Sequence, residues 1–367
     1  MTPNIPPPGV SPQEPQWHNP TQSRSSKRRS ASFFVAIFLG ILLLVSAALN
    51  LLLLVISVGS MASVGLGGDA SDEGDAGYVV TRTSGEADAE CKVLRIPIRG
   101  VIAEEGNSVL GAGGGMVSQV RLALKFAKND EKVRGILLEI DSPGGGVTDS
   151  DAIYQMLMKF RAERADVKVI ALFGDIAASG GYYVAAAAER IMARRTTITG
   201  SIGVIMSSWN FAEAAKKFGI EQIAIKSDRT PLKDMLSQTR AMSEAEKVML
   251  TSIVDDFYDQ FVSIVDDGRP NLDRSQVLAL ATGGVYTAKQ ALTNGLIDEI
   301  GDATTAEALF RKELGSVQFI ERHRQPSLRD LLFGVHAPVV PTFAEAAARL
   351  FSASTGPRFL YYWEGAR

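Results

Sequence analysis

The feature that most constrains this chain of 367 residues is a long uncharged run near its amino terminus. No acidic or basic side chain occurs between residues 30 and 68, and the most apolar part covers residues 33–58. A helix over that part would be about 39 Å long, enough to cross a hydrocarbon core of about 30 Å with some tilt. The alternative is a cleaved signal peptide, whose apolar stretch has roughly 7 to 15 residues. The pattern therefore predicts an uncleaved transmembrane helix over residues 31–58.

Basic residues before this run set its orientation. Residues 1–30 are rich in proline and carry Arg28 and Arg29 near their end, which predicts a disordered tail on the cytoplasmic side. The rest of the chain then lies on the far side of the membrane. In a bacterium, this describes a single-pass protein of the inner (cytoplasmic) membrane with its folded part in the periplasm.

Composition excludes several classes of function. There are 38 basic and 41 acidic side chains, and this formal charge of -3 leaves no basic excess for binding nucleic acid. One cysteine and three histidines cannot supply the usual zinc cages, so we expect no metal site. No histidine lies between residues 19 and 322. A base in the folded part is therefore more readily a lysine or a carboxylate.

The remaining sequence predicts one α/β domain. Residues 59–91 are rich in Gly, Ser, Ala, Asp and Glu and are expected to form a linker. Residues 92–322 alternate short apolar runs with amphipathic stretches, which is typical of repeated βαβ units with a mainly parallel sheet. Residues 323–367 form a C-terminal extension. Its apolar end, residues 359–363, is expected to pack on the domain, on a neighbouring copy or on lipid, with core packing preferred.

Two glycine-rich turns follow predicted strands, where open α/β sheets place their active sites. The first contains Gly144 and Gly145, whose uncovered N–H groups could bind an anion. A plain strand-to-helix turn is the alternative, and a phosphate loop is less suitable because no G-K-[ST] follows. The second turn places Ser179 before Gly180 at the start of a helix, where serine is also a common N-cap.

The two turns together favour acyl transfer. Such chemistry usually keeps two N–H donors for the oxyanion, because losing one costs about 3 to 4 kcal/mol of transition-state stabilisation. The Gly144 and Gly145 turn would supply one donor, and Gly180 the second, next to Ser179 as nucleophile. Without a histidine nearby, a lysine is the natural base, as in serine–lysine dyads.

Three segments, GILLEIDSPGGGVTDSD, ALFGDIAASGGYYVAAAAERI and TITGSIGVIM, closely resemble the signal peptide peptidase A family of membrane-anchored Ser/Lys peptidases, and GGVYTAKQALTNGLIDEIG resembles its later block. The resemblance covers residues 93–321 and implies a fold like Clp protease and the crotonases. It also implies that Ser179 is the nucleophile, that Lys233 is the general base and that Ser201 holds this lysine. Lys226 is a rival base, because its segment also resembles the family.

The chain resembles the short members of this family, which have one Ser/Lys unit. The resemblance implies a homo-oligomer, an octamer, in which the serine of one copy meets the lysine of the next. It implies remnant signal peptides and other hydrophobic peptides as substrates, with no metal or organic cofactor. Two alternatives stay open: a crotonase-like acyl-CoA enzyme, and a catalytically inactive membrane scaffold with the same fold.

Overall fold

A computed structural model describes residues 37–52, 78–104, 115–324 and 359–363. The chain divides into two compact units, Met1–Asp72 and Glu73–Arg367.

The described part of the first unit is a helix over residues 37–52, which lies inside the predicted membrane segment. Among the described residues, no helix has both the length and the apolar character needed to cross a membrane. The predicted tail over residues 1–30 and both ends of the predicted helix over residues 31–58 lie outside the described residues. The transmembrane helix therefore stays a prediction.

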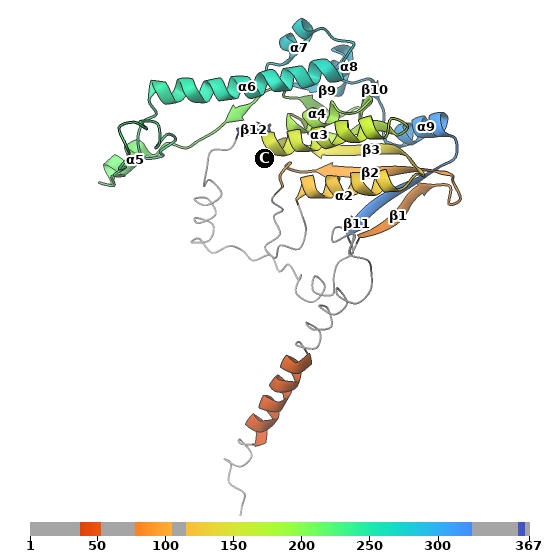
Figure 1. Ribbon diagram of the computed structural model, residues 1–367, viewed down its shortest axis with the longest axis horizontal. Coiled ribbons are helices and arrows are strands. Elements are labelled where there is room, and N and C mark those ends of the chain that lie inside the picture. Colours follow the sequence, from red (N-terminus) through yellow and green to blue (C-terminus); the bar gives the residue numbers. More distant parts are fainter. Residues whose placement is uncertain (1–36, 53–77, 105–114, 325–358, 364–367) are drawn as a thin grey trace, which may run out of the picture. The chain divides into compact units, whose positions relative to one another are not determined.

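The second unit is built on a sheet of nine strands (Figure 1). Its strands are β1 (Tyr78–Gly85), β2 (Cys91–Arg99), β3 (Val133–Ser142), β5 (Lys168–Ala178), β6 (Arg190–Ala193), β7 (Ile198–Gly200), β9 (Val285–Thr287), β10 (Glu299–Ile300) and β11 (Val317–Arg324). A second sheet contains β4 (Gly144–Gly146), β8 (Ile205–Met206) and β12 (Phe359–Tyr362). The helices are α2 (Met116–Asn129), α3 (Val147–Glu163), α4 (Gly180–Ala185), α5 (Ala212–Lys217), α6 (Glu244–Gly268), α7 (Arg274–Leu280), α8 (Ala288–Thr293) and α9 (Ala303–Leu314).

The order of the large sheet is β1-β11-β2-β3-β5-β6-β10, with β7 and β9 branching from β5. Its pairs are parallel from β11 to β10, whereas β1 joins β11 and β9 joins β7 in antiparallel pairs. This arrangement confirms the predicted α/β class with a mainly parallel sheet. It also fits a Clp-protease-like fold.

Alternating side chains of the central strands pack on opposite faces of the sheet. Ile136 and Leu138 of β3 belong to the core cluster that includes residues of α2, α3 and α4. Leu137 belongs to a second cluster with Phe310 of α9. The first cluster places α4, and with it the start of the candidate site, over the middle of the sheet.

Capping boxes, which are local sequence patterns, mark several helix starts. Ser243 with Glu246 and Thr287 with Gln290 form capping boxes at the starts of α6 and α8. The helix that was predicted to start at Gly180 is short, since α4 ends at Ala185. The strand β1 lies within the segment expected to be a linker. Because its residues are exposed or half-buried and none is fully buried, its pairing with the distant β11 leaves no apolar pattern in the sequence.

A buried ion pair holds the end of α6 in place. Arg269 is 3% exposed, and its guanidinium donates to the Asp298 carboxylate at 2.7 and 2.9 Å. Asp298 also accepts the backbone N–H of Ile191 at 2.7 Å. Burial raises the pKa of Asp298, but the bonds from Arg269 and Ile191 outweigh it and hold this pKa below its usual value. Separately, a Cβ atom added at Gly268 would lie 2.6 Å from the Ala186 carbonyl oxygen, so the end of α6 packs closely on the end of α4.

We expect Arg269→Met to lower the free energy of unfolding at pH 7 by about 3 kcal/mol, because Asp298 loses its partner; this is the low end of the range for buried pairs, since Asp298 is one-third exposed. Urea denaturation measures the change. The pKa of Asp298 is lower in the folded state, so the stabilisation is present above about pH 4 and is lost as the pH falls through the folded pKa. The difference between variant and wild type should therefore shrink in acid.

Arg190→Met is the control, because Arg190 pairs with Glu299 at the surface, with side chains 44% and 41% exposed. It should change stability by less than about 1 kcal/mol. Equal effects of the two variants would contradict a special role for the buried pair.

Candidate active site

Two glycine-rich turns meet at the carboxyl ends of β3 and β5. A Cβ atom added at Gly144 would lie 2.8 Å from the backbone nitrogen of Gly180, and one added at Gly180 would lie 3.1 Å from the nitrogen of Gly145. Gly144 has a φ of 104°, a conformation that other residues rarely adopt. Only glycines allow the two backbones to approach so closely. The structure thus brings Gly144, Gly145 and Gly180 together, with backbone N–H groups of both turns side by side.

Ser179 lies between β5 and α4 in a strained conformation. Its φ of 53° and ψ of −116° are unusual for a residue with a side chain, and such strain is often found at functional sites. Its backbone nitrogen donates to the Gly200 carbonyl at 2.8 Å, and its carbonyl accepts from the Tyr183 nitrogen at 2.9 Å. The hydroxyl makes no capping hydrogen bond to α4. Ser179 therefore occupies the N-cap position without the side-chain bond that would make capping its role.

Ser201 lies next to Ser179. The strands β5 and β7 are parallel, and Ala178 pairs with Gly200, so both serines leave the sheet at the same level. Ser201 also has a positive φ of 51°, and its backbone nitrogen donates to the Gly284 carbonyl at 2.7 Å. A cavity of about 600 Å³ opens beside Ser201, between α6 and the turn at residues 282–283. There is room here for a further group to reach Ser201.

Two residues not singled out from the sequence support these turns. Ser142 is fully buried, and its hydroxyl accepts the N–H of Gly144 at 3.1 Å. One carboxylate oxygen of Asp141 accepts the N–H groups of Asp175 and Ile176, both at 3.1 Å. Asp141 thereby joins the end of β3 to the part of β5 that leads to Ser179. In the sequence, Asp141 and Ser142 are marked only by their position, as two polar residues between a buried strand and the turn that begins with Pro143.

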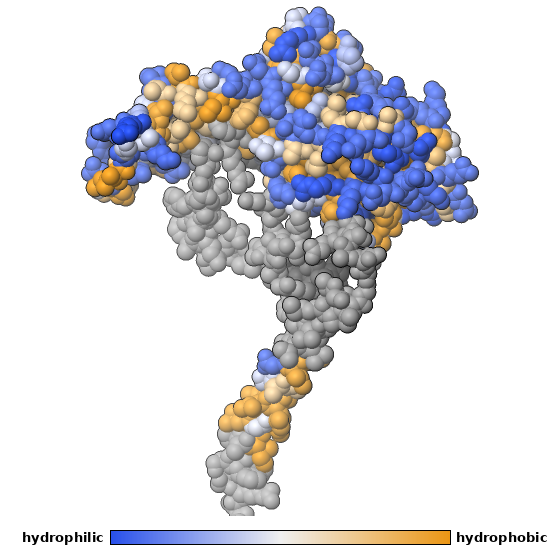
Figure 2. All heavy atoms as spheres, in the orientation of Figure 1, coloured by the Kyte–Doolittle hydropathy of each residue, from blue (hydrophilic) through white to orange (hydrophobic). Residues whose placement is uncertain are grey.

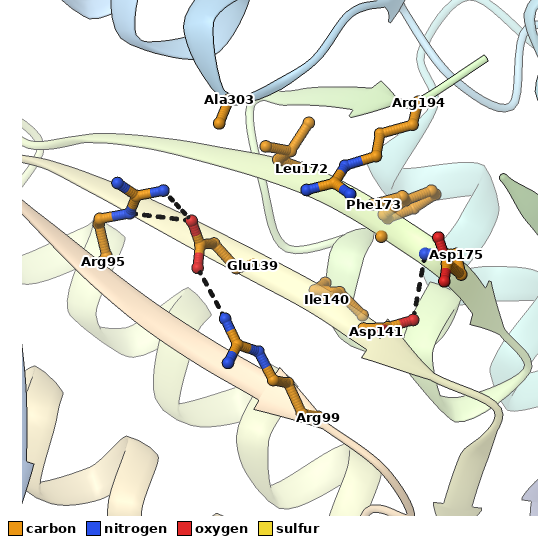
Figure 3. A pocket seen from close by; sticks show the side chains of 11 residues that line it. Arg95, Arg99, Glu139, Ile140, Asp141, Leu172, Phe173, Asp175, Arg194 and Ala303 are labelled. Carbon is orange, nitrogen blue, oxygen red and sulfur yellow. Dashed lines mark hydrogen bonds and ion pairs between the residues drawn. The ribbon is translucent and has the colours of Figure 1, made fainter. Parts of the chain in front are cut away.

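Figure 3 shows a different cavity, of about 380 Å³, over the ends of β2, β3 and β5. Its walls include Glu139, which is paired with Arg95 and Arg99. No serine, threonine, cysteine, lysine or histidine lines it, so it is not the candidate catalytic site. In the part of the chain that the structure describes, no group of three or more His, Cys, Asp or Glu side chains could hold a metal ion.

The candidate lysines lie on a segment of residues 209–242, which we call the arm. Figure 1 shows it beyond the amino-terminal end of α6. Lys233 is exposed. Lys226 donates to the Asp234 carboxylate and, at 2.7 Å, to the Pro231 carbonyl. Among the described residues, no hydrogen bond joins either lysine to Ser179 or Ser201. A single chain therefore brings the two serines and the three glycines together, but neither of the two lysines.

Asp234 anchors this part of the arm. Its hydrogen bonds from Arg240 and Lys226 lower its pKa to about 2, so it stays ionised near neutral pH. Arg240 also pairs with Glu246, the buried capping residue of α6. The loop that carries Lys233 is thereby tied to the first turn of α6.

Comparison with known proteins identifies the family. A protein named signal peptide peptidase SppA from Enterococcus faecium is 37% identical over 236 residues, which is 64% of this chain and 67% of that protein. A protease from Synechocystis sp. is 41% identical, over 57% of this chain and 70% of that protein. The family model for peptidase family S49 matches residues 161–316. The chain belongs to the signal peptide peptidase A family, peptidase family S49. It is a serine peptidase.

Other similarities of this S49 peptidase are partial. Protease 4 of Haemophilus influenzae is 32% identical, over 59% of this chain and 34% of that protein. A solved structure of a mutant of the 1510-N membrane-bound stomatin-specific protease is 16% identical, with a TM-score of 0.39, and covers 59% of this chain and 84% of that chain. The S49 match contains Ser179, Ser201 and both candidate lysines, while the Gly144 turn precedes it.

We expect Gly144→Ala to lower kcat/KM of the S49 peptidase by about 100-fold or more, because the added methyl group would lie 2.0 Å from the Tyr361 carbonyl oxygen and 2.8 Å from the Gly180 nitrogen and must push the Gly144 turn away from both. Hydrolysis of a fluorogenic hydrophobic peptide measures the change. Gly100→Ala is the matched control: Gly100 also has a positive φ, of 77°, but no atom lies within 4 Å of the added methyl group. If thermal unfolding shows both variants folded and both are equally active, close contact between the turns is not required.

Proposed function

We propose that this protein is a membrane-anchored serine endopeptidase with a Ser/Lys dyad that degrades remnant signal peptides and other hydrophobic peptides. Ser179 is the nucleophile, and the backbone N–H groups of Gly145 and Gly180 bind the oxyanion, while the N–H of Gly144 is bonded to Ser142 and shapes the turn. The main support is the hydroxyl of Ser179, which makes no capping bond and lies in a strained turn beside those donors. Serines of acyl-transfer enzymes occupy similar strained turns between a strand and a helix.

In this proposal Lys233 is the base. Its uncharged amine takes the Ser179 proton as the hydroxyl oxygen bonds to the peptide carbonyl carbon. The carbon–nitrogen bond then breaks, and the proton passes to the leaving amine. A water molecule, deprotonated by the same amine, hydrolyses the resulting ester and frees Ser179. Ser201 orients the amine from its place beside Ser179.

Lys226 is the weaker candidate. Its amine is bonded to the Asp234 carboxylate and to the Pro231 carbonyl, and both bonds would have to break before the amine could reach Ser179. Lys233, which follows two residues after Pro231, makes no ion pair in the described part of the chain. The geometry of the arm thus supports Lys233.

The arm itself supports assembly with a second copy. Figure 2 shows hydrophobic side chains gathered on it and on the start of α6. Large apolar side chains that are more than 60% exposed in this region are Trp209, Phe218, Ile220, Ile223, Ile225 and Val248. Exposed apolar surface of this kind marks an interaction site. We propose that it packs on another copy and carries Lys233 into the cavity beside Ser201, in a homo-oligomer, an octamer.

The location follows from the predicted anchor. A helix over residues 31–58, with the basic residues before it in the cytoplasm, places the peptidase outside the cytoplasm at the inner membrane of a bacterium. Hydrophobic peptides left in that membrane would then lie close to the site.

A fluorophosphonate probe, which reacts with activated serines, tests this proposal on the full-length protein in detergent or lipid. We expect labelling of the wild type, complete loss with Ser179→Ala, and a loss of about 1,000-fold or more in peptide hydrolysis with Lys233→Ala. Lys226→Ala should keep most of the activity and is the matched control on the same arm. Labelling that survives Ser179→Ala would contradict the assignment.

Activity that survives Lys233→Ala but not Lys226→Ala would move the base to Lys226. If the assembled wild type neither reacts with the probe nor cleaves peptides, an inactive scaffold becomes the better description.

A further inference from the structure

One buried hydroxyl group near the candidate site has no hydrogen-bond partner. Ser150, at the end of the first turn of α3, is fully buried, and its Oγ makes no hydrogen bond within the described ranges of the chain. Ser142 is equally buried, but its hydroxyl accepts the Gly144 N–H. A buried hydroxyl without a partner destabilises the folded state, and native proteins contain few of them. The unpaired Ser150 hydroxyl therefore calls for a physical reason.

Ser150 Oγ lies beside the gap between the two glycine-rich turns. A Cβ atom added at Gly180 would lie 2.5 Å from Ser150 Oγ, and the same point is 3.1 Å from the Gly145 nitrogen. Helix α3 starts directly after Gly146, and Figure 1 shows it beside α4, the helix that starts at Gly180. The hydroxyl is thus next to the two N–H groups that are proposed to bind the oxyanion.

A neutral carbonyl group in this gap does not engage the Ser150 hydroxyl. The Tyr361 oxygen lies 3.1 Å from the point that the added Gly180 Cβ would occupy, yet it accepts no hydrogen bond from Ser150. In the proposed reaction the oxygen of the attacked carbonyl gains negative charge, and hydrogen bonds to charged acceptors are shorter and stronger. Catalytic hydrogen bonds are often long or poorly aligned in the resting enzyme and tighten in the transition state. The charged oxygen is therefore a suitable acceptor for Ser150.

We propose that Ser150 donates a third hydrogen bond to the oxyanion, beside the N–H groups of Gly145 and Gly180. This inference rests on the proposed peptidase mechanism and adds a side-chain donor to it. Because the bond forms only as negative charge develops, it stabilises the transition state and leaves substrate binding unchanged. The resting enzyme then keeps an unpaired hydroxyl that lowers its stability, and such a loss of stability in favour of activity is common at catalytic sites.

Ser150→Ala in the full-length protein separates this role from a structural one. We expect kcat for a fluorogenic hydrophobic peptide to fall by about 100-fold, with KM within about threefold of the wild type, because the lost bond exists only in the transition state. The midpoint of thermal unfolding should rise by about 4 °C, because the variant no longer buries an unpaired hydroxyl. A serine that only supports packing would not lower kcat while it raises stability.

Ser263→Ala is the matched control. Ser263 also lies within a helix, α6, and its hydroxyl donates to the Asp259 carbonyl at 2.8 Å. This variant should keep the kcat of the wild type and an unfolding midpoint within about 2 °C of it. Unchanged kcat in Ser150→Ala would overturn the inference, and so would a fall in kcat together with a lower midpoint, which indicates disturbed packing. If the assembled wild type cleaves no peptide, the proposed function fails instead.

Inhibitor binding gives a second test. A peptide trifluoromethyl ketone forms a charged tetrahedral adduct with a nucleophilic serine, so Ser150→Ala should weaken its binding by about the same 100-fold factor by which kcat/KM falls. The matching peptide alcohol cannot form the adduct and should bind the wild type and the variant equally. Weaker binding of both inhibitors by Ser150→Ala, or of neither, would contradict a third oxyanion donor.

Discussion

The close approach of two backbones, at Gly144 and Gly145 on one side and Gly180 on the other, is the constraint on which the site depends. A methyl group on Gly144 would lie 2.8 Å from the Gly180 nitrogen, and one on Gly180 would lie 3.1 Å from the Gly145 nitrogen. Ser179 lies in a strained turn beside this contact, and the N–H groups of Gly145 and Gly180 are the candidates to bind an anion, because the N–H of Gly144 is bonded to Ser142. The surrounding structure stabilises this contact. Asp141 and Ser142 hold the turns through hydrogen bonds at the end of β3, and α6 packs on α4.

The same chain that builds this contact keeps its candidate bases on the exposed arm. Asp234 and Arg240 tie the loop of Lys233 to α6, and large apolar side chains face outward nearby. The cavity beside Ser201 is open in the single chain. These features agree with a site in which one copy supplies Ser179 and the glycine turns and another copy supplies the lysine base. Activity would then require assembly, which keeps an unassembled chain from cutting peptides.

Much of the fold was predictable because its signals are local. Buried strands such as β3 are apolar runs, and the capping boxes at Ser243 and Thr287 mark helix starts. The glycine turns and Ser179 could be found for the same reason. The pairing of β12 with β4 could not, because it joins residues more than 200 positions apart and depends on a register that no local pattern encodes. The position of Lys233 relative to Ser179 was not predictable from residue spacing, since the arm belongs to neither the sheet nor its core.

Mixing two inactive proteins tests most directly whether the site is shared between copies. Full-length Ser179→Ala and Lys233→Ala chains are co-expressed, and peptide hydrolysis is compared with that of each variant alone. If the serine of one copy meets the lysine of the next around a closed ring, about one quarter of the sites in random mixtures have both groups, and activity should recover to that fraction of the wild type. Mixed oligomers, shown by two affinity tags on one particle, that stay inactive would contradict the account.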